Sequence, residues 1–345
     1  MTILLPTSAS QEFLDLALAG DRSQAIRLAL GLLDDGVPLP VLLPDLLGAA
    51  QCEIGDRWHR ATATTAEEHV VTGVSQAALE ALISNAHRHA PEGTVVVACA
   101  EGDWHSLAAQ MLAEALRADG QGVLYLGAST PAEDVAALLE RRRPDALVVT
   151  CNVALSYLGV ARLVDAAHVH GVPVLAGGRA LNPARAVVLG ADAWAVDVAS
   201  AAHLLRTWRR DPPQVGVVPV EIGMAAVELD ALAGELGGLA YDALAERFPP
   251  MAHYDRRQRA RTREDLVYIV RFLSAARLVD DDEVFTEFTA WLEELLVSRG
   301  VPAAALAAGL GVLAPLVRDV DEHSGELASA AAAAVGRPIG VLGPS

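Results

Sequence analysis

The stretch of sequence that decides the fold is TVVVACAEGDWHSLAA, residues 94–109. It opens with a short apolar run, which is typical of a strand that is buried on both faces. A turn that contains Asp103 and His105 follows, and helical spacing begins after it. This order predicts the first unit of a parallel sheet, with Asp103 and His105 on the turn between the strand and its helix.

Four more short apolar runs follow the first, separated by helical stretches of about a dozen residues. This alternation predicts a doubly wound parallel sheet with helices on both faces, an α/β domain at residues 91–210. Ligands of such sheets bind at the carboxyl ends of the strands. The four runs are GVLYLGA (122–128), DALVVTC (145–151), VPVLAGG (172–178) and ADAWAVD (191–197).

Helical patterns lie on both sides of the predicted sheet. Residues 1–90 contain four segments with apolar residues at helical spacing, which predict a small helical bundle. Residues 211–223 are rich in Pro and Gly and predict a linker. Residues 224–336 are helical again, and residues 337–345 are expected to be a loose tail. The fold class is therefore α/β plus all-α.

The composition excludes several classes of function. The net charge of −18 argues against binding to nucleic acid or to an anionic membrane. Every basic residue is Arg, so Schiff-base and P-loop chemistry, which need Lys, are excluded. The three cysteines are scattered, and the chain shows neither a signal peptide nor an apolar run of about 20 residues. These features predict a reduced cytoplasmic protein.

Asp103 and His105 suit the ligation of a metal ion. A histidine two residues from a carboxylate can donate one ring N–H to it, which fixes the tautomer and makes the other ring nitrogen more basic. Taken alone, the Asp-x-His pattern favours a simpler interpretation, a surface-loop histidine beside a helix N-cap aspartate. The choice therefore depends on the rest of the domain.

Three motifs together resemble the cobalamin-binding domain family, over roughly residues 94–200. That family carries Asp-x-His-x-x-Gly, then Ser-x-Leu, then Gly-Gly. Here Ala108 replaces the first Gly, Thr150 keeps only the hydroxyl of Ser-x-Leu, and Gly177-Gly178 is complete. The resemblance implies that His105 binds cobalt from below while the cofactor's benzimidazole tail enters the sheet. Thr150 would then bond the buried base, and the two glycines would let the backbone approach the tail closely.

The bundle contains RWHRATATTAEEH, residues 57–69, with two polar pairs. Taken alone, Trp58 would be a core aromatic residue and Glu68-His69 a solvated helix face. The Trp-x9-Glu-His pattern, however, resembles the cap of the light-sensing adenosylcobalamin proteins, which include bacterial transcriptional repressors. The resemblance implies that Trp58 packs on the adenosyl group, that Glu68 accepts hydrogen bonds from its ribose, and that His69 supports this pocket.

A bulky Trp in this place leaves little room for a substrate, which predicts a chromophore site and not an enzyme. His59, next to Trp58, is a candidate to bind cobalt from above after light releases the adenosyl group. The repressors carry a DNA-binding domain before the bundle, and this chain begins with the bundle. The expected output is therefore contact with a signalling partner protein or a light-dependent homo-oligomer, without nucleic acid or membrane.

TREDLVYIVRFLSAARLVDDD, residues 262–282, resembles the phycobiliprotein helix that holds a linear tetrapyrrole, which implies a globin-like domain. Asp265 matches the aspartate that accepts hydrogen bonds from pyrrole N–H groups. Thr262 stands where that family has its attachment cysteine, so biliverdin would be bound without a covalent link. Cations nearby suit the propionates. The implied contact residues are His253, Tyr254, Arg261, Arg263, Asp265, Tyr268 and Arg271. The alternative is a helical dimerisation domain with a solvated Arg-rich face.

The order of the three domains resembles the photocobilins, photoreceptors that combine cobalamin with biliverdin. This resemblance implies a photoreceptor that binds adenosylcobalamin and biliverdin. Two alternatives remain open. One is a corrinoid shuttle protein of a methyltransferase system, which needs an open upper face on the corrin. The other is a non-photoactive cobalamin-binding scaffold with a structural C-terminal domain.

Overall fold

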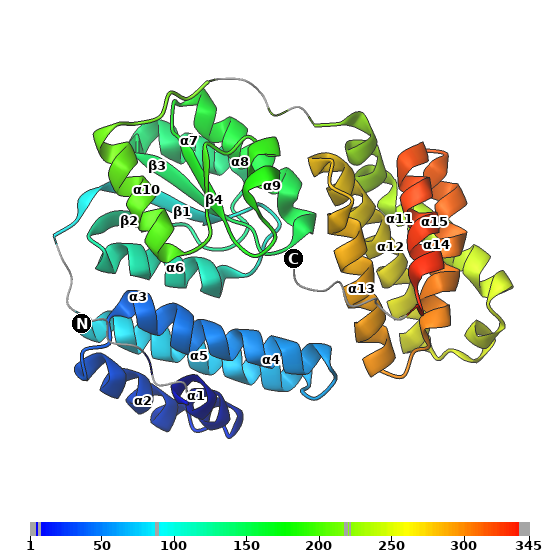
Figure 1. The fold of residues 1–345 in the computed structure, drawn as a ribbon, viewed down its shortest axis with the longest axis horizontal. Coiled ribbons are helices and arrows are strands. Elements are labelled where there is room, and N and C mark those ends of the chain that lie inside the picture. The colour runs from blue at the N-terminus through cyan, green and yellow to red at the C-terminus, as the bar shows by residue number, and fades with distance from the viewer. Residues whose placement is uncertain (1–4, 6–7, 87–89, 217–219, 221, 338–345) are drawn as a thin grey trace. The chain divides into compact units, whose positions relative to one another are not determined.

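The computed structural model describes residues 5, 8–86, 90–216, 220 and 222–337 (Figure 1). The chain divides into two compact units between Val220 and Glu221, which lies inside the segment expected to be a linker. Apart from Arg337, the predicted tail at 337–345 lies outside the described residues. No helix within the described residues is long and apolar enough to cross a membrane.

The first unit begins with a helical bundle of four segments, as the spacing of apolar residues predicts. They are α1 (Ala9–Leu18), α2 (Arg22–Asp34), a composite third segment and α5 (Thr65–Asn85). The third segment begins as α3 (Leu39–Leu42), widens into the π-helical η1 (Leu43–Gly48) and continues as α4 (Ala49–His59). Pro44 lies in the widened turn, where its missing N–H removes one regular helical hydrogen bond.

The middle of the first unit is a five-stranded parallel sheet with the order β2-β1-β3-β4-β5, which confirms the predicted sheet. Its strands are β1 (Glu92–Cys99), β2 (Gln121–Tyr125), β3 (Ala146–Thr150), β4 (Val174–Gly177) and β5 (Ala193–Ala195). Cys99 pairs with Thr150, and Thr150 pairs with Gly177. The loops after β1, β3 and β4 therefore leave the same edge side by side, where the strand order reverses and ligands of such folds bind.

Helices cover both faces of the sheet (Figure 1). On one face, α6 (Ser106–Ala118) and α10 (Val198–Arg210) pack against the side chains of Val95, Val97 and Val148. On the other face, α8 (Tyr157–Val169) contacts β3 and β4, with α7 (Ala132–Arg142) beside it. The short α9 (Pro183–Val188) contacts β5.

Helix α6 joins the sheet to the bundle because it is apolar on two sides. Leu107, Met111 and Ala115 pack into the core of the bundle. Gln110 adds a polar link, since it exchanges hydrogen bonds of 2.8 and 2.9 Å with Gln76 and Glu80 of α5. α6 starts directly after His105, so the same helix fixes both the bundle and the loop that carries His105.

The second unit is all-helical in its described residues, as predicted. It consists of α11 (Met224–Arg247), η3 (Pro249–His253), α12 (Arg256–Val279), α13 (Glu283–Ser298), α14 (Ala303–Arg318) and α15 (Glu322–Ala334). A Cβ at Gly237 of α11 would lie 2.6 Å from Val267 Cγ2 of α12, so this glycine allows the two helices to pack closely. A globin-like arrangement of these helices stays a prediction.

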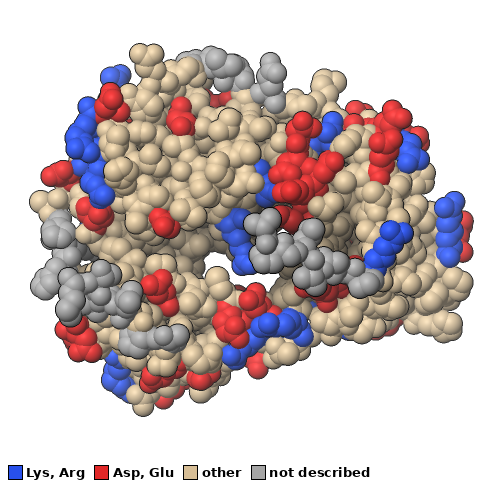
Figure 2. Space-filling model, viewed as in Figure 1, with Lys and Arg blue, Asp and Glu red and all other residues tan. Residues whose placement is uncertain are grey.

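The face drawn in Figure 2 carries its charges in small separate groups. Basic side chains form no broad continuous area among the described residues of this face. Among its described residues, this face therefore has no basic stripe of the kind that binds nucleic-acid backbones.

Candidate functional site

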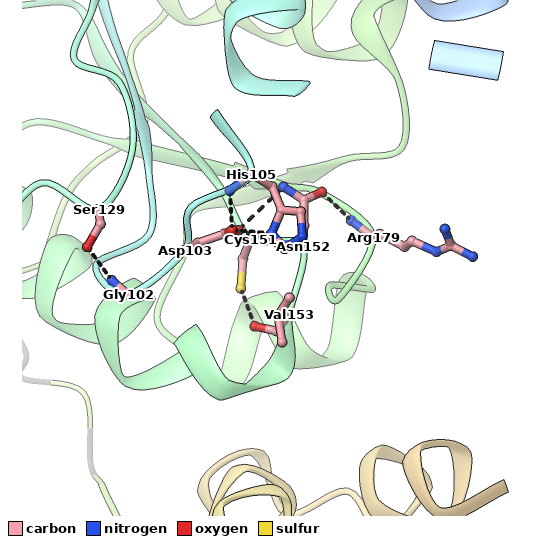
Figure 3. A network of polar contacts seen from close by, with 8 residues as sticks. All are labelled: Gly102, Asp103, His105, Ser129, Cys151, Asn152, Val153 and Arg179. Carbon is pink, nitrogen blue, oxygen red and sulfur yellow. Dashed lines mark hydrogen bonds and ion pairs between the residues drawn. The ribbon is translucent and has the colours of Figure 1, made fainter. Parts of the chain in front are cut away.

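Asp103 is the centre of a polar network at the carboxyl edge of the sheet (Figure 3). Its Oδ1 accepts hydrogen bonds from the backbone N–H of His105 at 2.9 Å and from Nδ1 of the same residue at 2.7 Å. Its Oδ2 accepts from the backbone N–H of Asn152 at 2.7 Å. Burial raises the pKa of Asp103, but these hydrogen bonds outweigh it and hold the pKa below its usual value.

The simpler interpretation of the Asp-x-His pattern does not describe Asp103. This residue is only 1% exposed, and the N-cap position of α6 is occupied by His105. A buried carboxylate that accepts hydrogen bonds from its own loop and from the loop after β3 is a fixed structural anion and not a surface cap.

His105 offers one ring nitrogen to a ligand. Its Nδ1 is held by Asp103, which leaves Nε2, and its side chain is 60% exposed. The hydrogen bond to Asp103 raises the pKa of His105, burial lowers it, and the charges of Asp103 and Glu68 raise it further. The contribution of Glu68 is informative because this residue belongs to the bundle. The Glu68 carboxylate of the bundle therefore lies near enough to the loop histidine for its charge to act on the imidazole.

The loop that carries Asp103 is held from two sides. The N–H of Gly102 donates to Ser129 Oγ at 2.9 Å, and the N–H of Ser129 donates to the Asp103 carbonyl at 3.0 Å. On the other side, a Cβ at Gly159 of α8 would overlap the backbone of Glu101. The helix therefore packs directly against the loop, and the sequence analysis assigned no individual role to Ser129 or to Gly159.

A cleft of about 160 Å³ opens between the sheet and helices α6 and α10. Small residues keep it open, among them Ala108, Ala176, Gly177, Gly178, Ala195 and Ala201. Thr150 also lines it, and its Oγ1 is buried with no hydrogen-bond partner of good geometry among the described residues. Its neighbour Cys99 is a thiol, because burial raises the Cys99 pKa to about 11, and a thiol is a weak partner. A polar atom of a ligand in the cleft would satisfy this hydroxyl.

The two glycines at the end of β4 have different structural reasons. Gly178 has a φ of +108°, and a Cβ there would overlap the backbone of Cys151. Gly177 lines the cleft, and its Cβ would lie 3.1 Å from the carbonyl oxygen of Ala195. The prediction assigned both glycines to room for a ligand. In the structure, Gly178 is needed because its own φ and the nearby backbone of Cys151 leave no place for a side chain.

The sequence of the first unit matches two known domain families. Residues 93–203 match the family model of the B12 binding domain, and residues 9–83 match a second model that is also described as a B12 binding domain. The chain is a cobalamin-binding protein.

Individual relatives include both a repressor and corrinoid proteins. The chain is 31% identical over 150 residues to the HTH-type transcriptional repressor CarH of Myxococcus xanthus, which covers 41% of this chain and 48% of the repressor. It is 33% identical over 93 residues to the methanol–corrinoid protein of Methanosarcina barkeri, which covers 26% of this chain and 36% of that protein. The match therefore spans less than half the length of each of these relatives.

A solved structure supports the fold of the first unit. The monomethylamine corrinoid protein of Methanosarcina barkeri aligns with a TM-score of 0.51 at 22% sequence identity. The alignment covers 57% of this chain and 96% of that protein. The two proteins therefore share the fold of a helical segment joined to a parallel α/β domain.

The residues at the carboxyl edge fit cobalamin. His105 Nε2 would bind the cobalt, Asp103 would hold the imidazole in place, and the cleft beside Thr150 would hold the tail. Trp104 is 76% exposed and Val196 is 70% exposed at the same edge, and neither was singled out from the sequence. An apolar ring system bound there would cover exposed surface of this kind.

The predicted cap residues lie in the hairpin of α4 and α5. Trp58 is half-buried on the last turn of α4, and its indole N–H donates to Thr65 Oγ1 at 3.2 Å. Glu68 lies on the first turn of α5, with His69 Nε2 3.5 Å from its Oε2. His59 is half-buried at the end of α4. Trp58 is thus neither a core aromatic residue nor fully exposed.

Asn152 is a site residue that the sequence reading missed. It stands where the family motif has Leu, and its side chain makes two contacts that Leu cannot make. Its Nδ2 lies 3.4 Å from Asp103 Oδ2, and its Oδ1 lies 3.4 Å from the backbone N of Arg179 (Figure 3). The side chain therefore bridges the loops after β1 and β4. The available signal was a polar residue at an apolar motif position.

The residues predicted to bind a bilin are spread along α12 and the segment before it. His253 and Tyr254 precede the helix, and Asp265 lies about 15 Å further along its axis, at 1.5 Å per residue. Burial raises the pKa of the Asp265 carboxyl to about 6. Tyr268, one turn beyond it, is 47% exposed.

The arginines of this group each have a local partner. Arg261 Nη1 pairs with Glu264 at 2.8 Å, and the Arg263 guanidinium lies 4.5 Å from the centre of the Tyr241 ring. Arg271 Nε is 3.7 Å from Asp230 Oδ1. These contacts fix three cations on the surface of the second unit without joining them into one network.

Proposed function

We propose that the chain is a light-sensing photoreceptor that binds adenosylcobalamin between its bundle and its α/β domain. When bound, this cofactor supplies a light-sensitive cobalt–carbon bond. The observation that carries the proposal is that the bundle residue Glu68 lies near enough to His105 for its charge to raise the His105 pKa, with Trp58 on the neighbouring helix. The hairpin would hold the group carried by the cofactor, and His105, on the loop between β1 and α6, would supply the protein ligand to the cobalt.

The side chains have separate tasks in this proposal. His105 binds cobalt through Nε2, and Asp103 fixes its tautomer. Trp58 fills the space above the metal and packs on the adenosyl group. Glu68, supported by His69, accepts hydrogen bonds from the ribose. His59 would hold the metal once the adenosyl group has left.

The proposed output is a change in the hairpin that alters contact with a partner protein or between copies of the chain, without an enzymatic step. The packing of the bundle on α6 supports this idea. Leu107 and Met111 follow His105 within two turns of α6 and contact the bundle core. A movement of the bundle is therefore mechanically linked to the position of the loop that carries His105.

We also propose biliverdin as a second chromophore, bound without a covalent link in the second unit. Asp265 supports this proposal because a half-buried carboxyl with a raised pKa gains from donors such as pyrrole N–H groups. Arg261, Arg263 and Arg271 would face the propionates, with His253, Tyr254 and Tyr268 as further contacts. Thr262 supplies no thiol for attachment.

The decisive test is an absorption spectrum of the protein loaded with adenosylcobalamin and biliverdin, before and after green light. The expected result is a changed cobalamin spectrum in the wild type and a different illuminated spectrum in His59→Ala. An unchanged cobalamin spectrum after illumination would remove the photoreceptor proposal. Identical illuminated spectra would remove His59 alone.

The 33% identity to the methanol–corrinoid protein favours one other candidate, a corrinoid carrier for methyl transfer. A carrier needs access to the upper face of the corrin, which Trp58 would restrict. Methyl transfer to a partner without any light response would support the carrier.

A further inference from the structure

A partly buried hydrogen-bond chain lies beside Glu68, between α4 and α5, and only its last member, Ser75, is fully buried. Thr72 Oγ1 is 2.9 Å from Glu68 Oε1 and also 2.9 Å from Gln51 Oε1. The other side-chain amide atom of Gln51 is 2.9 Å from Ser75 Oγ. Glu68, Thr72 and Ser75 are spaced i, i+4 and i+7, so one face of α5 carries all three toward Gln51 of α4.

The number of protons decides how this chain is directed. Thr72 has one hydroxyl proton and two acceptor oxygens within reach, so it can donate to only one of them. If Thr72 donates to Gln51, the oxygen atoms of Thr72 and Glu68 are left in contact with no proton between them. If Thr72 donates to Glu68, the Gln51 amide must turn so that its NH₂ group donates to Thr72.

The turned amide satisfies every member of the chain. Gln51 Oε1 then accepts a hydrogen bond from the hydroxyl of Ser75, which is 0% exposed. Without this bond, the Ser75 hydroxyl donates to no other described residue. Amide orientation is decided by such networks, since oxygen and nitrogen differ little in shape. The hydrogen bonds then run in one direction, from Ser75 through Gln51 and Thr72 to the Glu68 carboxylate.

We propose that Thr72 is a positioning residue for Glu68 and a determinant of which upper group the protein accepts. The hydrogen-bond chain fixes one carboxylate oxygen of Glu68 before a ligand arrives. The other oxygen is then already oriented to accept a hydrogen bond from the ligand, and less conformational entropy is lost on binding. The inference rests on the proposed adenosyl pocket. It adds that Thr72, with Gln51 and Ser75 behind it, favours cobalamins whose upper group carries hydroxyls.

The test compares adenosylcobalamin with methylcobalamin in darkness, because the methyl group has no hydroxyl for Glu68. Thr72→Val keeps the shape and removes the donor. It is expected to weaken adenosylcobalamin binding by about fivefold, the scale of one modest hydrogen bond, and to leave methylcobalamin affinity unchanged. Thr72→Ser is expected to restore the wild-type preference.

Thr207→Val is the matched control, since Thr207 is a half-buried helical threonine whose hydroxyl donates only to its own helix, at the His203 carbonyl. An unchanged ratio of the two affinities in Thr72→Val, or an equal loss for both cobalamins, would overturn the inference. Glu68→Ala separates the two levels. If both Glu68→Ala and Thr72→Val leave the ratio of the two affinities unchanged, the proposed adenosyl pocket is wrong. If Glu68→Ala changes the ratio and Thr72→Val does not, only the role of the hydrogen-bond chain is wrong.

Discussion

The carboxyl edge of the sheet and the surface of α12 both gather polar residues, but they do so in different ways. At the sheet edge, Asp103 receives hydrogen bonds from its own loop and from Asn152, 49 residues away. On α12, Arg261 and Arg263 are satisfied by Glu264 and by the Tyr241 ring. The first region is a network that joins distant parts of the chain, and the second is a row of separate pairs.

This difference decides how firmly each region supports a ligand. A network of buried, mutually bonded groups is rigid before a ligand binds, which suits an axial histidine that must keep one orientation. Exposed pairs contribute little and can rearrange. The comparison predicts large, coupled effects of substitution at the sheet edge and small, independent effects on α12.

Gly178→Ala is expected to have the largest effect. The added Cβ meets both an unfavourable φ of +108° and the backbone of Cys151, so the free energy of unfolding should fall by about 2–4 kcal/mol. Urea unfolding of the full chain measures it. Gly127→Ala is the control, because Gly127 has a φ of +89° but open space around it, and should lose only about 1–2 kcal/mol. Equal losses in both variants would contradict the role given to Cys151.

Asp103→Asn should weaken cobalamin binding by about 10- to 100-fold, the usual result of changing the partner of a metal-binding histidine. The amide keeps the shape but replaces a charged acceptor beside His105 Nδ1. Equilibrium dialysis with hydroxocobalamin measures the affinity. Asp119→Asn, in a surface ion pair with Arg206, should bind like the wild type. Wild-type affinity in Asp103→Asn would show that the network does not support the metal ligand.

Asp265→Asn should stabilise the second unit in a pH-dependent way. Burial raises the pKa of this carboxyl from 3.8 to about 6, so the folded state holds its proton more firmly than the unfolded state does. The wild type therefore loses stability as the pH rises from about 4 to about 6. The variant should gain about 1–2 kcal/mol at pH 7, allowing for partial exposure, and little at pH 4.

Scanning calorimetry of the full chain at pH 4 and pH 7 measures this effect. Glu264→Gln, at the preceding position and paired with Arg261 on the surface, is the control; because its charge is only a lesser cause of the raised Asp265 pKa, this variant should show a clearly weaker pH dependence. A gain for Asp265→Asn that is equal at both pH values would contradict the buried-carboxyl explanation. The same substitution should weaken biliverdin binding if Asp265 accepts hydrogen bonds from the pyrroles.

The smallest expected effects test the comparison most directly. Asn152→Leu, which restores the motif residue, should weaken cobalamin binding by about two- to fivefold. Combined with Asp103→Asn, it should show a coupling of about 0.5–1 kcal/mol. Arg263→Ala and Asp265→Asn should combine additively within about 0.5 kcal/mol in unfolding. Additivity at the sheet edge, or coupling on α12, would break the distinction between network and separate pairs.

The sequence by itself determined the helices and strands and identified cobalamin as the bound cofactor. Short apolar runs predicted the five parallel strands, and helical spacing predicted the bundle and the helices of the second unit, because burial imposes these local periods. The motif around Asp103 and His105 predicted a cobalamin site, since strand–turn–helix order brings a turn to the carboxyl edge of the sheet. A globin-like arrangement needs more than helical periods, which do not specify how helices cross.

Only the tertiary structure decided which residues complete the sites. Asn152, Ser129 and Gly159 act on the Asp103 loop from other strands and helices, and Gln51 reaches Thr72 across 21 residues. Only Asn152 carries a local signal, a polar residue at an apolar motif position; the contacts of the others depend on strand register and on how helices pack. A hydrogen bond requires atoms within about 3 Å, and that precision is set by packing between elements and not by the period within one.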